Sequence, residues 1–232
     1  KMILYNFIDK FLMNDFNSEI KNRLNHKNPI IFDVGCFNGN FSRKLIKDLK
    51  LKKVNFYLFD ANPNLKIKEF KYFNEVFSNK VSYRNFNLNT FFPSSGSSLK
   101  KTIKDDKLWN FSRRLITMKF NQPFAIIKVK TNTLDNFCKI KKIKKVDLLK
   151  IDVEGSELDV LRGAKKLLNS VSIIQLEILQ RKNKFLREKN KILVFLKKHN
   201  FRLIKEKKIP SVGILSSSIS EDLLFIKDRV IS

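Results

Sequence analysis

The alternation of short apolar runs with amphipathic stretches is the feature that most constrains the fold of this chain. From residue 30 onward, runs of strand length rich in β-branched and aromatic residues are followed by segments with apolar residues at helical spacing. The predicted strands are 30–35, 54–60, 81–87, 124–131, 146–153, 171–179, 201–206 and 222–228. Strands that alternate with helices favour a mostly parallel sheet with helices on both faces. The pattern therefore predicts an α/β fold.

The segments between these strands carry the helical pattern. The predicted helices are 41–51, 64–76, 156–168 and 183–199, and Thr133 is expected to cap a further short one. The first residues place apolar side chains at helical spacing, interrupted by Asp9 and Asp15, which predicts an amphipathic helix and not a signal sequence. We divide the chain into an N-terminal helical segment, 1–29, and one domain, 30–232.

The formal net charge of +26 is high for such a domain. The lysines are spread along the chain, which favours a solvated basic surface over a clustered footprint for nucleic acid. A partner with phosphates or an anionic membrane surface is the alternative. No apolar run approaches the roughly 18 residues that a membrane span needs. Two cysteines cannot build a disulfide framework, so we predict a reducing, cytoplasmic location.

Acidic side chains gather where the predicted strands end. Asp33, Asp60 and Asp152 each lie at the end of a strand, and Glu177 lies near the end of another. In sheets of this kind, ligands bind in the crevice at the carboxyl ends of the strands, where the strand order reverses. A carboxylate is costly to desolvate without a cationic or hydrogen-bonding neighbour, so a basic chain with an acidic crevice needs a cationic partner there.

The stretch "DVGCFNG" follows the first strand and opens a helix. Gly35 can adopt positive φ, and Gly39 permits close approach at the helix start. Phe37 stands where a dinucleotide fingerprint has its second glycine, so the turn suits a ligand without phosphates. Asp60, 27 residues beyond Asp33, can accept hydrogen bonds from both hydroxyls of a ribose.

The stretch "KIDVEGSE" concentrates negative charge after a buried strand. Asp152 is expected to face the crevice, and Glu154 begins the next loop. Glu157 and Asp159 fit the first turn of the following helix, where the helix dipole favours anions. The carboxylates that remain suit a cationic cofactor.

Four stretches, "DVGCFNGNFS", "FDANP", "VKTNTLDNF" and "LLKIDVEGSELDVLRGA", together resemble the FkbM family of S-adenosylmethionine-dependent methyltransferases over about residues 30–180. The resemblance implies a Rossmann-like class I methyltransferase with a seven-stranded sheet and S-adenosylmethionine at the glycine turn. It implies Asp60 on the ribose and Phe86 and Asn87 near adenine. The expected cofactor-binding residues are Asp33, Gly35, Cys36, Phe37, Gly39, Asp60, Ala61, Phe86, Asn87 and Asp152. Family members often have Asn at Phe37 and Glu at Asp60.

We expect methyl transfer to a hydroxyl oxygen of a sugar or another small metabolite, the acceptors that the resemblance implies. Asp152, Glu154 and Glu177 are the candidate bases for the hydroxyl proton. We assign no resident metal, although Asp152 and Glu177 holding a divalent ion is an alternative route to an acidified hydroxyl. His26 and His199 are expected at the surface. The loop over 88–122, with "PSSGSS" and two arginines, is expected to cover the acceptor.

Two other functions remain open from the sequence. The net charge favours methylation of RNA ribose, but the chain has neither an Asp/Asn-Pro-Pro-aromatic stretch nor a cysteine that follows a proline. The chain could also be a module that binds the cofactor without catalysis. The sequence indicates no oligomeric state.

Overall fold

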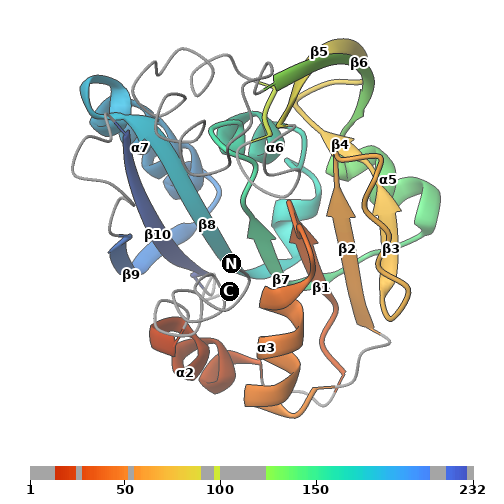
Figure 1. Cartoon of the computed structure of the whole chain (residues 1–232). Coiled ribbons are helices and arrows are strands. Elements are labelled where there is room, and N and C mark those ends of the chain that lie inside the picture. Colours follow the sequence, from red (N-terminus) through yellow and green to blue (C-terminus); the bar gives the residue numbers. More distant parts are fainter. Residues whose placement is uncertain are drawn as a thin grey trace.

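The centre of the molecule is a seven-stranded sheet with the order β3-β2-β1-β7-β8-β10-β9 (Figure 1). This computed structural model describes residues 14–24, 28–51, 55–89, 97–99, 124–209 and 218–228. The strands are β1 (Ile31–Val34), β2 (Phe56–Asp60), β3 (Lys71–Asn74), β7 (Val146–Ile151), β8 (Val171–Arg181), β9 (Phe201–Ile209) and β10 (Ser218–Lys227). The first five strands in the sheet order pair in parallel, and β10 runs antiparallel to both β8 and β9. The predicted α/β, Rossmann-like sheet is therefore confirmed.

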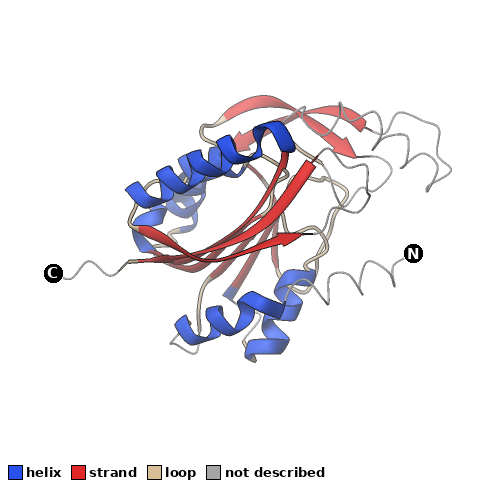
Figure 2. Cartoon of the chain, turned by 90° about the vertical axis from the view of Figure 1, so that its left-hand side faces the viewer, coloured by secondary structure: helices blue, strands red, loops and turns tan. Residues whose placement is uncertain are grey.

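Helices cover both faces of this sheet (Figure 2). On one face lie α2 (Asn14–Arg23) and α3 (Asn40–Leu49); on the other lie α5 (Leu134–Lys141), α6 (Glu157–Arg162) and α7 (Lys182–Lys198). Each face has its own apolar core. Ile20 and Leu45 pack with Leu148 in the first core, and Phe137 and Leu196 belong to the second.

A second, three-stranded sheet with the order β4-β6-β5 lies apart from the first (Figure 1). It contains β4 (Val76–Phe77), β5 (Ser82–Asn89) and β6 (Phe124–Asn132). Residues 81–87 were expected to form the third strand of the main sheet, and that expectation is wrong. Residues 82–89 pair antiparallel with β6, whereas β3 pairs with β2 in the main sheet.

The helix expected over 64–76 is also absent, because this stretch contains β3 and the start of β4. The two aromatic residues of β3 point to opposite sides of the sheet. Phe73 packs against the core under α5, and Tyr72 packs against the core under α3. This alternation is the pattern of a strand, and Phe73 gains stacked and edge-on contacts with Tyr57, Phe59 and Phe137.

The other helices lie close to their predicted positions. Thr133 caps α5, since its hydroxyl accepts a hydrogen bond from the backbone N–H of Asn136. The helix expected over 156–168 ends at Arg162, and a short 3₁₀ helix, η3 (Leu167–Ser170), precedes β8. Gly163, at the end of α6, packs so closely on the carbonyl oxygen of Ser78 that a Cβ would lie 2.1 Å from it.

Some predictions fall outside the described residues. These concern residues 1–13, His26, most of the "PSSGSS" loop and the arginines at 113–114. The division of the chain at residue 29/30 stays a prediction. Both cysteines are unpaired and buried. Among the helices of the described segments, none has the length and apolar character needed to cross a membrane.

Candidate active site at the carboxyl edge of the sheet

The face of the sheet under α3 changes from apolar to charged toward its carboxyl edge. Residues paired in register on neighbouring strands share a face. The innermost row is apolar and consists of Ile31, Leu148 and Ile173. The next row contains Asp33, Lys150, Gln175 and Leu224. The last paired residues of the parallel strands are Val34–Ile151 and Ile151–Leu176. One residue further along each strand lies the outermost row, which consists of Gly35, Asp152, Glu177 and, opposite Glu177 on β10, Asp222.

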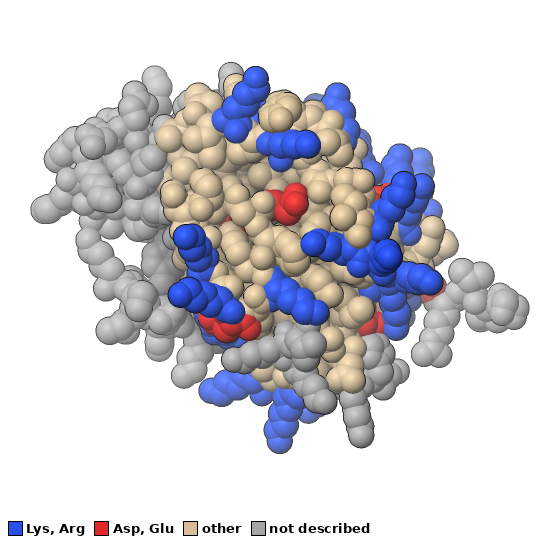
Figure 3. Space-filling model, turned by 90° about the vertical axis from the view of Figure 1, so that its right-hand side faces the viewer, with Lys and Arg blue, Asp and Glu red and all other residues tan. Residues whose placement is uncertain are grey.

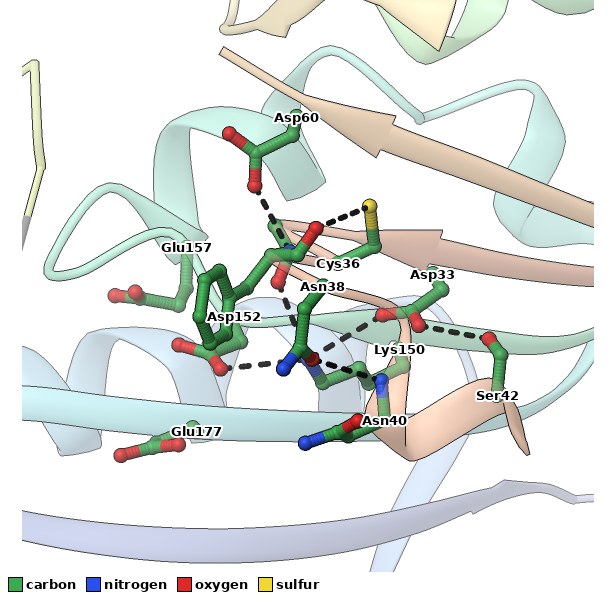
Figure 4. Close-up of polar contacts among 12 residues, drawn as sticks. Asp33, Cys36, Asn38, Asn40, Ser42, Asp60, Lys150, Asp152, Glu157 and Glu177 are labelled. Atoms are coloured by element: carbon green, nitrogen blue, oxygen red, sulfur yellow. Dashed lines mark hydrogen bonds and ion pairs between the residues drawn. The ribbon is translucent and has the colours of Figure 1, made fainter. Parts of the chain in front are cut away.

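Lys150 is the cation at the centre of this edge (Figure 4). Its Nζ lies 3.3 Å from Asp33 Oδ1, 3.3 Å from Asp152 Oδ2 and 3.4 Å from the carbonyl oxygen of Gly35. Burial on its own would lower the pKa of Lys150, but the charges of Asp33, Asp152 and Glu177 raise it above the ordinary value. Lys150 therefore stays charged and supplies part of the cationic partner that the buried carboxylates require.

Asp33 is fully buried. Besides the ion pair with Lys150, its Oδ2 accepts a hydrogen bond of 2.8 Å from the hydroxyl of Ser42 on α3. A charge in this position is tolerated because it has both a cationic and a hydrogen-bonding neighbour. Asp33 thus ties β1, β7 and the start of α3 together at the base of the site.

The glycine turn after β1 has the geometry that its sequence predicted. Gly35 has φ +78° and Gly39, at the start of α3, has φ +79°. The carbonyl of Asp152 crosses so close to Gly35 that a Cβ would lie 1.7 Å from its oxygen. The N–H groups of Gly35 and Cys36 both donate to the carbonyl of Phe59, at 2.9 and 3.0 Å. The turn is therefore held against both β2 and the end of β7.

Asp60 holds the outer part of the same turn. One carboxylate oxygen accepts from the N–H of Phe37 at 2.9 Å, and the other accepts from the N–H of Asn62 at 2.8 Å. Burial raises the pKa of Asp60, and these two hydrogen bonds work against the rise. Each oxygen keeps a lone pair for a further donor, so the carboxylate still fits a pair of ribose hydroxyls. Ala61 follows it directly and is partly buried.

Cys36 and Phe37 contribute to the turn in different ways. The Cys36 side chain is buried in the apolar core under α3. Burial, followed by the charges of Asp33 and Asp60, raises the pKa of its thiol, which disfavours the thiolate form. Phe37 has φ +48°, which turns its backbone N–H toward Asp60.

Glu177 lies on β8, beyond Lys150 toward β10 (Figure 4). Its Oε1 accepts a hydrogen bond of 2.7 Å from the hydroxyl of Ser220. Burial and the charges of Asp152, Asp222 and Glu154 raise its pKa well above the ordinary value. Asp222 is directly opposite on β10, and burial followed by the charge of Asp152 raises its pKa to about 7.

The remaining acidic residues of "KIDVEGSE" shape the loop after β7. Glu154 has φ +56° and its carbonyl accepts a 2.8 Å hydrogen bond from Ser98. Glu157 is buried at the start of α6, where its Oε1 accepts from the N–H of Gly155 at 2.7 Å. Asp159 forms an ion pair with Arg162. Glu157 and Asp159 lie in the first turn of α6, as predicted.

Phe86 and Asn87 lie on β5 of the second sheet, and not at the end of a strand of the main sheet. Both are buried. Asn87 pairs with Ser98, whose hydroxyl reaches the carbonyl of Glu154, so this strand is linked to the loop after β7. Their proximity to adenine stays a prediction. It assumed that these residues follow the third strand of the main sheet, and that assumption is wrong.

The residues of this edge fit S-adenosylmethionine, which carries an α-ammonium, a sulfonium and a ribose. The outer row presents three carboxylates, and Lys150 forms ion pairs with one of them, Asp152, and with Asp33 of the row below. Gln175 Oε1 is buried and has no hydrogen-bond partner among the described residues, so a ligand donor would satisfy it. Within the described part of the chain, no group of three or more His, Cys, Asp or Glu is arranged to hold a metal ion.

Sequence reasoning missed Lys150 and Asp222. The available signal was a lysine directly after two leucines in the predicted strand, and every position of β7 is in fact buried. Asp222 gave no such signal, since it is the first residue of the predicted strand 222–228 and reaches the site only because β10 runs antiparallel.

Comparisons with known proteins find similar methyltransferases. A family model described as the methyltransferase FkbM domain matches residues 33–203. The 2-O-methyltransferase NoeI of Sinorhizobium fredii is 28% identical over 171 residues, which cover 68% of this chain and 67% of that protein. A methyltransferase FkbM structure from Methylobacillus flagellatus has a TM-score of 0.45 at 11% identity, covering 85% of this chain and 44% of that one. The structure of M. capricolum TrmK in complex with S-adenosyl-homocysteine has a TM-score of 0.46 at 14% identity. The match covers 94% of this chain and 70% of that one.

Proposed function

This chain belongs to the FkbM methyltransferase family, and on that premise we propose that it methylates a hydroxyl oxygen of a sugar or another small metabolite. S-adenosylmethionine is the cofactor, and it supplies an electrophilic methyl group on a sulfonium. The observation that carries the site assignment is the charged carboxyl edge, where Asp33, Lys150 and Asp152 meet beside the glycine turn.

The residues of the edge have separate roles in this proposal. Asp60 binds the ribose hydroxyls, and its hydrogen bonds to the backbone of Phe37 and Asn62 fix its orientation. Asp152 faces the α-ammonium, while Lys150 holds its carboxylate in place. Cys36, Phe37 and Ala61 shape the pocket through their backbone. Much of the rate would come from positioning the acceptor, which can supply roughly 7–11 kcal/mol.

An oxygen acceptor is supported by the relative NoeI, whose name describes a 2-O-methyltransferase. The side chains at the edge agree with such chemistry, because a hydroxyl must lose its proton as the new bond forms. Burial and neighbouring charges raise the pKa of Glu177, and a carboxylate with a raised pKa is a stronger base toward that proton than an ordinary one.

Methylation of RNA ribose is the second candidate function, and the net charge of +26 favours it. Figure 3 shows Lys and Arg side chains in several separate groups on one face of the molecule, with other surface between them. A footprint for RNA would be a continuous basic track leading to the site. The distributed charge therefore favours the small-molecule acceptor.

The test is an acceptor screen with purified protein and methyl-labelled S-adenosylmethionine. Free sugars, nucleotide-linked sugars and total RNA are supplied in separate reactions, and transferred label and S-adenosylhomocysteine are both measured. We expect label on a sugar or a similar hydroxyl compound, in a form stable to mild base as an ether is. Label on RNA alone, or on a carboxyl or amine group, would overturn the proposal.

A further inference from the structure

We propose that Glu177 and Asp222 form a carboxyl pair that shares one proton, with Glu177 taking the proton of the acceptor hydroxyl during methyl transfer. This inference rests on the proposed function and deepens it. It selects one base among Asp152, Glu154 and Glu177, and it adds Asp222 as the residue that positions and tunes that base.

The two residues are brought together by the reversal of chain direction at β10. Glu177 on β8 and Asp222 on β10 are directly paired in the antiparallel register. Side chains of directly opposed residues point to the same face, with Cβ atoms about 4.5–5.5 Å apart. Two carboxylates at such a separation resist carrying two negative charges, so they titrate as a pair.

The surroundings of the pair favour one shared proton near neutral pH. The charges of Asp152 and Glu154, from the end of β7 and the loop after it, act on Glu177. Two lysines lower the pKa of Asp222. They are Lys150 on β7 and Lys207, which lies opposite Asp222 on β9. Burial prevails over them and leaves the pKa of Asp222 at about 7.

The hydroxyl of Ser220 donates to Glu177 Oε1 at 2.7 Å, which fixes the rotamer of this carboxyl group. Asp152, in contrast, forms an ion pair with Lys150 at 3.3 Å. Asp152 is therefore engaged by the ammonium of Lys150. Gln175 lies two residues before Glu177 on the same face. Its buried Oε1 has no hydrogen-bond partner in the described part of the chain, and a further hydroxyl of the acceptor could satisfy it.

The proposed step is balanced without another reactant. The acceptor oxygen bonds to the methyl carbon, the carbon–sulfur bond breaks, and its electron pair stays on sulfur. The step starts from the form of the pair that carries no proton, and the hydroxyl proton passes to the free oxygen of the Glu177 carboxylate. This is the one proton that the pair then shares, stabilised by the negative charge of Asp222, before it is released to solvent.

The first test needs neither acceptor nor cofactor. The carboxyl carbons of the full chain are labelled with ¹³C on Asp and Glu and titrated by NMR, in wild type, Glu177→Gln, Asp222→Asn and the control Asp228→Asn. Asp228 is exposed and forms an ion pair with Arg202, outside the site. In wild type we expect Glu177 and Asp222 to titrate together, with one step near pH 7. In Glu177→Gln and in Asp222→Asn, the titration step of the carboxyl group that remains should move down by at least one pH unit. Independent titration of both groups below about pH 5 would overturn the pair.

The second test measures turnover from pH 5 to 9 with the acceptor from the screen, together with S-adenosylhomocysteine affinity by calorimetry. We expect kcat to fall about 100-fold or more in Glu177→Gln. In Asp222→Asn the rise of kcat with pH should move to lower pH, because Glu177 loses its negative neighbour. Affinity for S-adenosylhomocysteine should change less than twofold. Unchanged kcat in Glu177→Gln would overturn the role of the base.

The two proposals fail in different ways. If wild type binds S-adenosylhomocysteine but methylates no hydroxyl compound, the proposed function fails. The NMR titration still decides whether the carboxyl pair exists, since it uses the protein alone.

Discussion

Lys150 explains how a chain with a net charge of +26 can bury negative charge at one edge. The sequence predicted that the carboxylates need a cationic partner, and it assigned that role to the cofactor. In the structure, one lysine from within the buried strand β7 already neutralises part of the charge of Asp33 and Asp152. The remaining carboxylates, at Glu177 and Asp222, then give the site its negative potential.

Replacing Lys150 with Met should destabilise the protein strongly. The variant leaves the fully buried Asp33 without its cation, and removing one partner of a buried ion pair costs about 3–5 kcal/mol. The free energy of unfolding, measured with urea, checks this. The double variant Lys150→Met, Asp33→Leu should regain most of the loss, because an apolar pair can replace a buried ion pair.

Arg202→Met is the matched control for this prediction. Arg202 and Asp228 form an exposed ion pair, and such pairs contribute about 1 kcal/mol or less. A Lys150→Met variant as stable as Arg202→Met would show that Lys150 does not hold the buried carboxylates.

Among the elements, the glycine turn between β1 and α3 is where the backbone itself limits the sequence. Gly35 and Gly39 have nearly the same positive φ, but their surroundings differ. A Cβ on Gly35 would meet the backbone oxygen of Asp152 at 1.7 Å, whereas a Cβ on Gly39 would first meet the Leu58 side chain at 3.2 Å. Backbone at the end of β7 cannot move aside as a leucine methyl can.

Gly35→Ala should therefore be far more costly than Gly39→Ala. The positive φ alone costs an alanine about 1–2 kcal/mol at either position, and the clash with the Asp152 backbone adds to it at Gly35. We expect losses of about 1–2 kcal/mol for Gly39→Ala and more than about 3 kcal/mol for Gly35→Ala. Thermal unfolding measures both, and equal losses would contradict the close approach of β7 to the turn.

Elements were predictable where local pattern and tertiary pairing agree. The strands β1, β2, β7 and β8 are rich in β-branched, leucine and aromatic residues, and the cap at Thr133 has its own local signal. β3 was mistaken for part of a helix because its four residues gain their strand partners only from β2. Likewise, no local feature of residues 82–89 reveals that they pair with β6, which lies more than 30 residues later.

At the scale of the whole molecule, the candidate site depends on how the strands are ordered. Asp33, Asp60 and Asp152 were predictable because parallel strands bring their carboxyl ends to one edge. Asp222 was not, because its strand is antiparallel and brings its beginning to that edge. The basic exterior is a separate property, since the lysines lie on many surface elements while Asp33, Asp152, Glu177 and Asp222 meet at the carboxyl edge of the sheet.

The central claim is that this carboxyl edge binds S-adenosylmethionine, and calorimetric titration tests it most directly. Purified wild type, Asp60→Ala and the exposed control Asp228→Ala are each titrated with S-adenosylmethionine and S-adenosylhomocysteine, and circular dichroism verifies that each is folded. Asp60→Ala should lose at least tenfold in affinity for both ligands, about 1.4 kcal/mol, while wild type and Asp228→Ala bind alike. Unchanged affinity in a folded Asp60→Ala variant, or a folded wild type that binds neither ligand, would contradict the account.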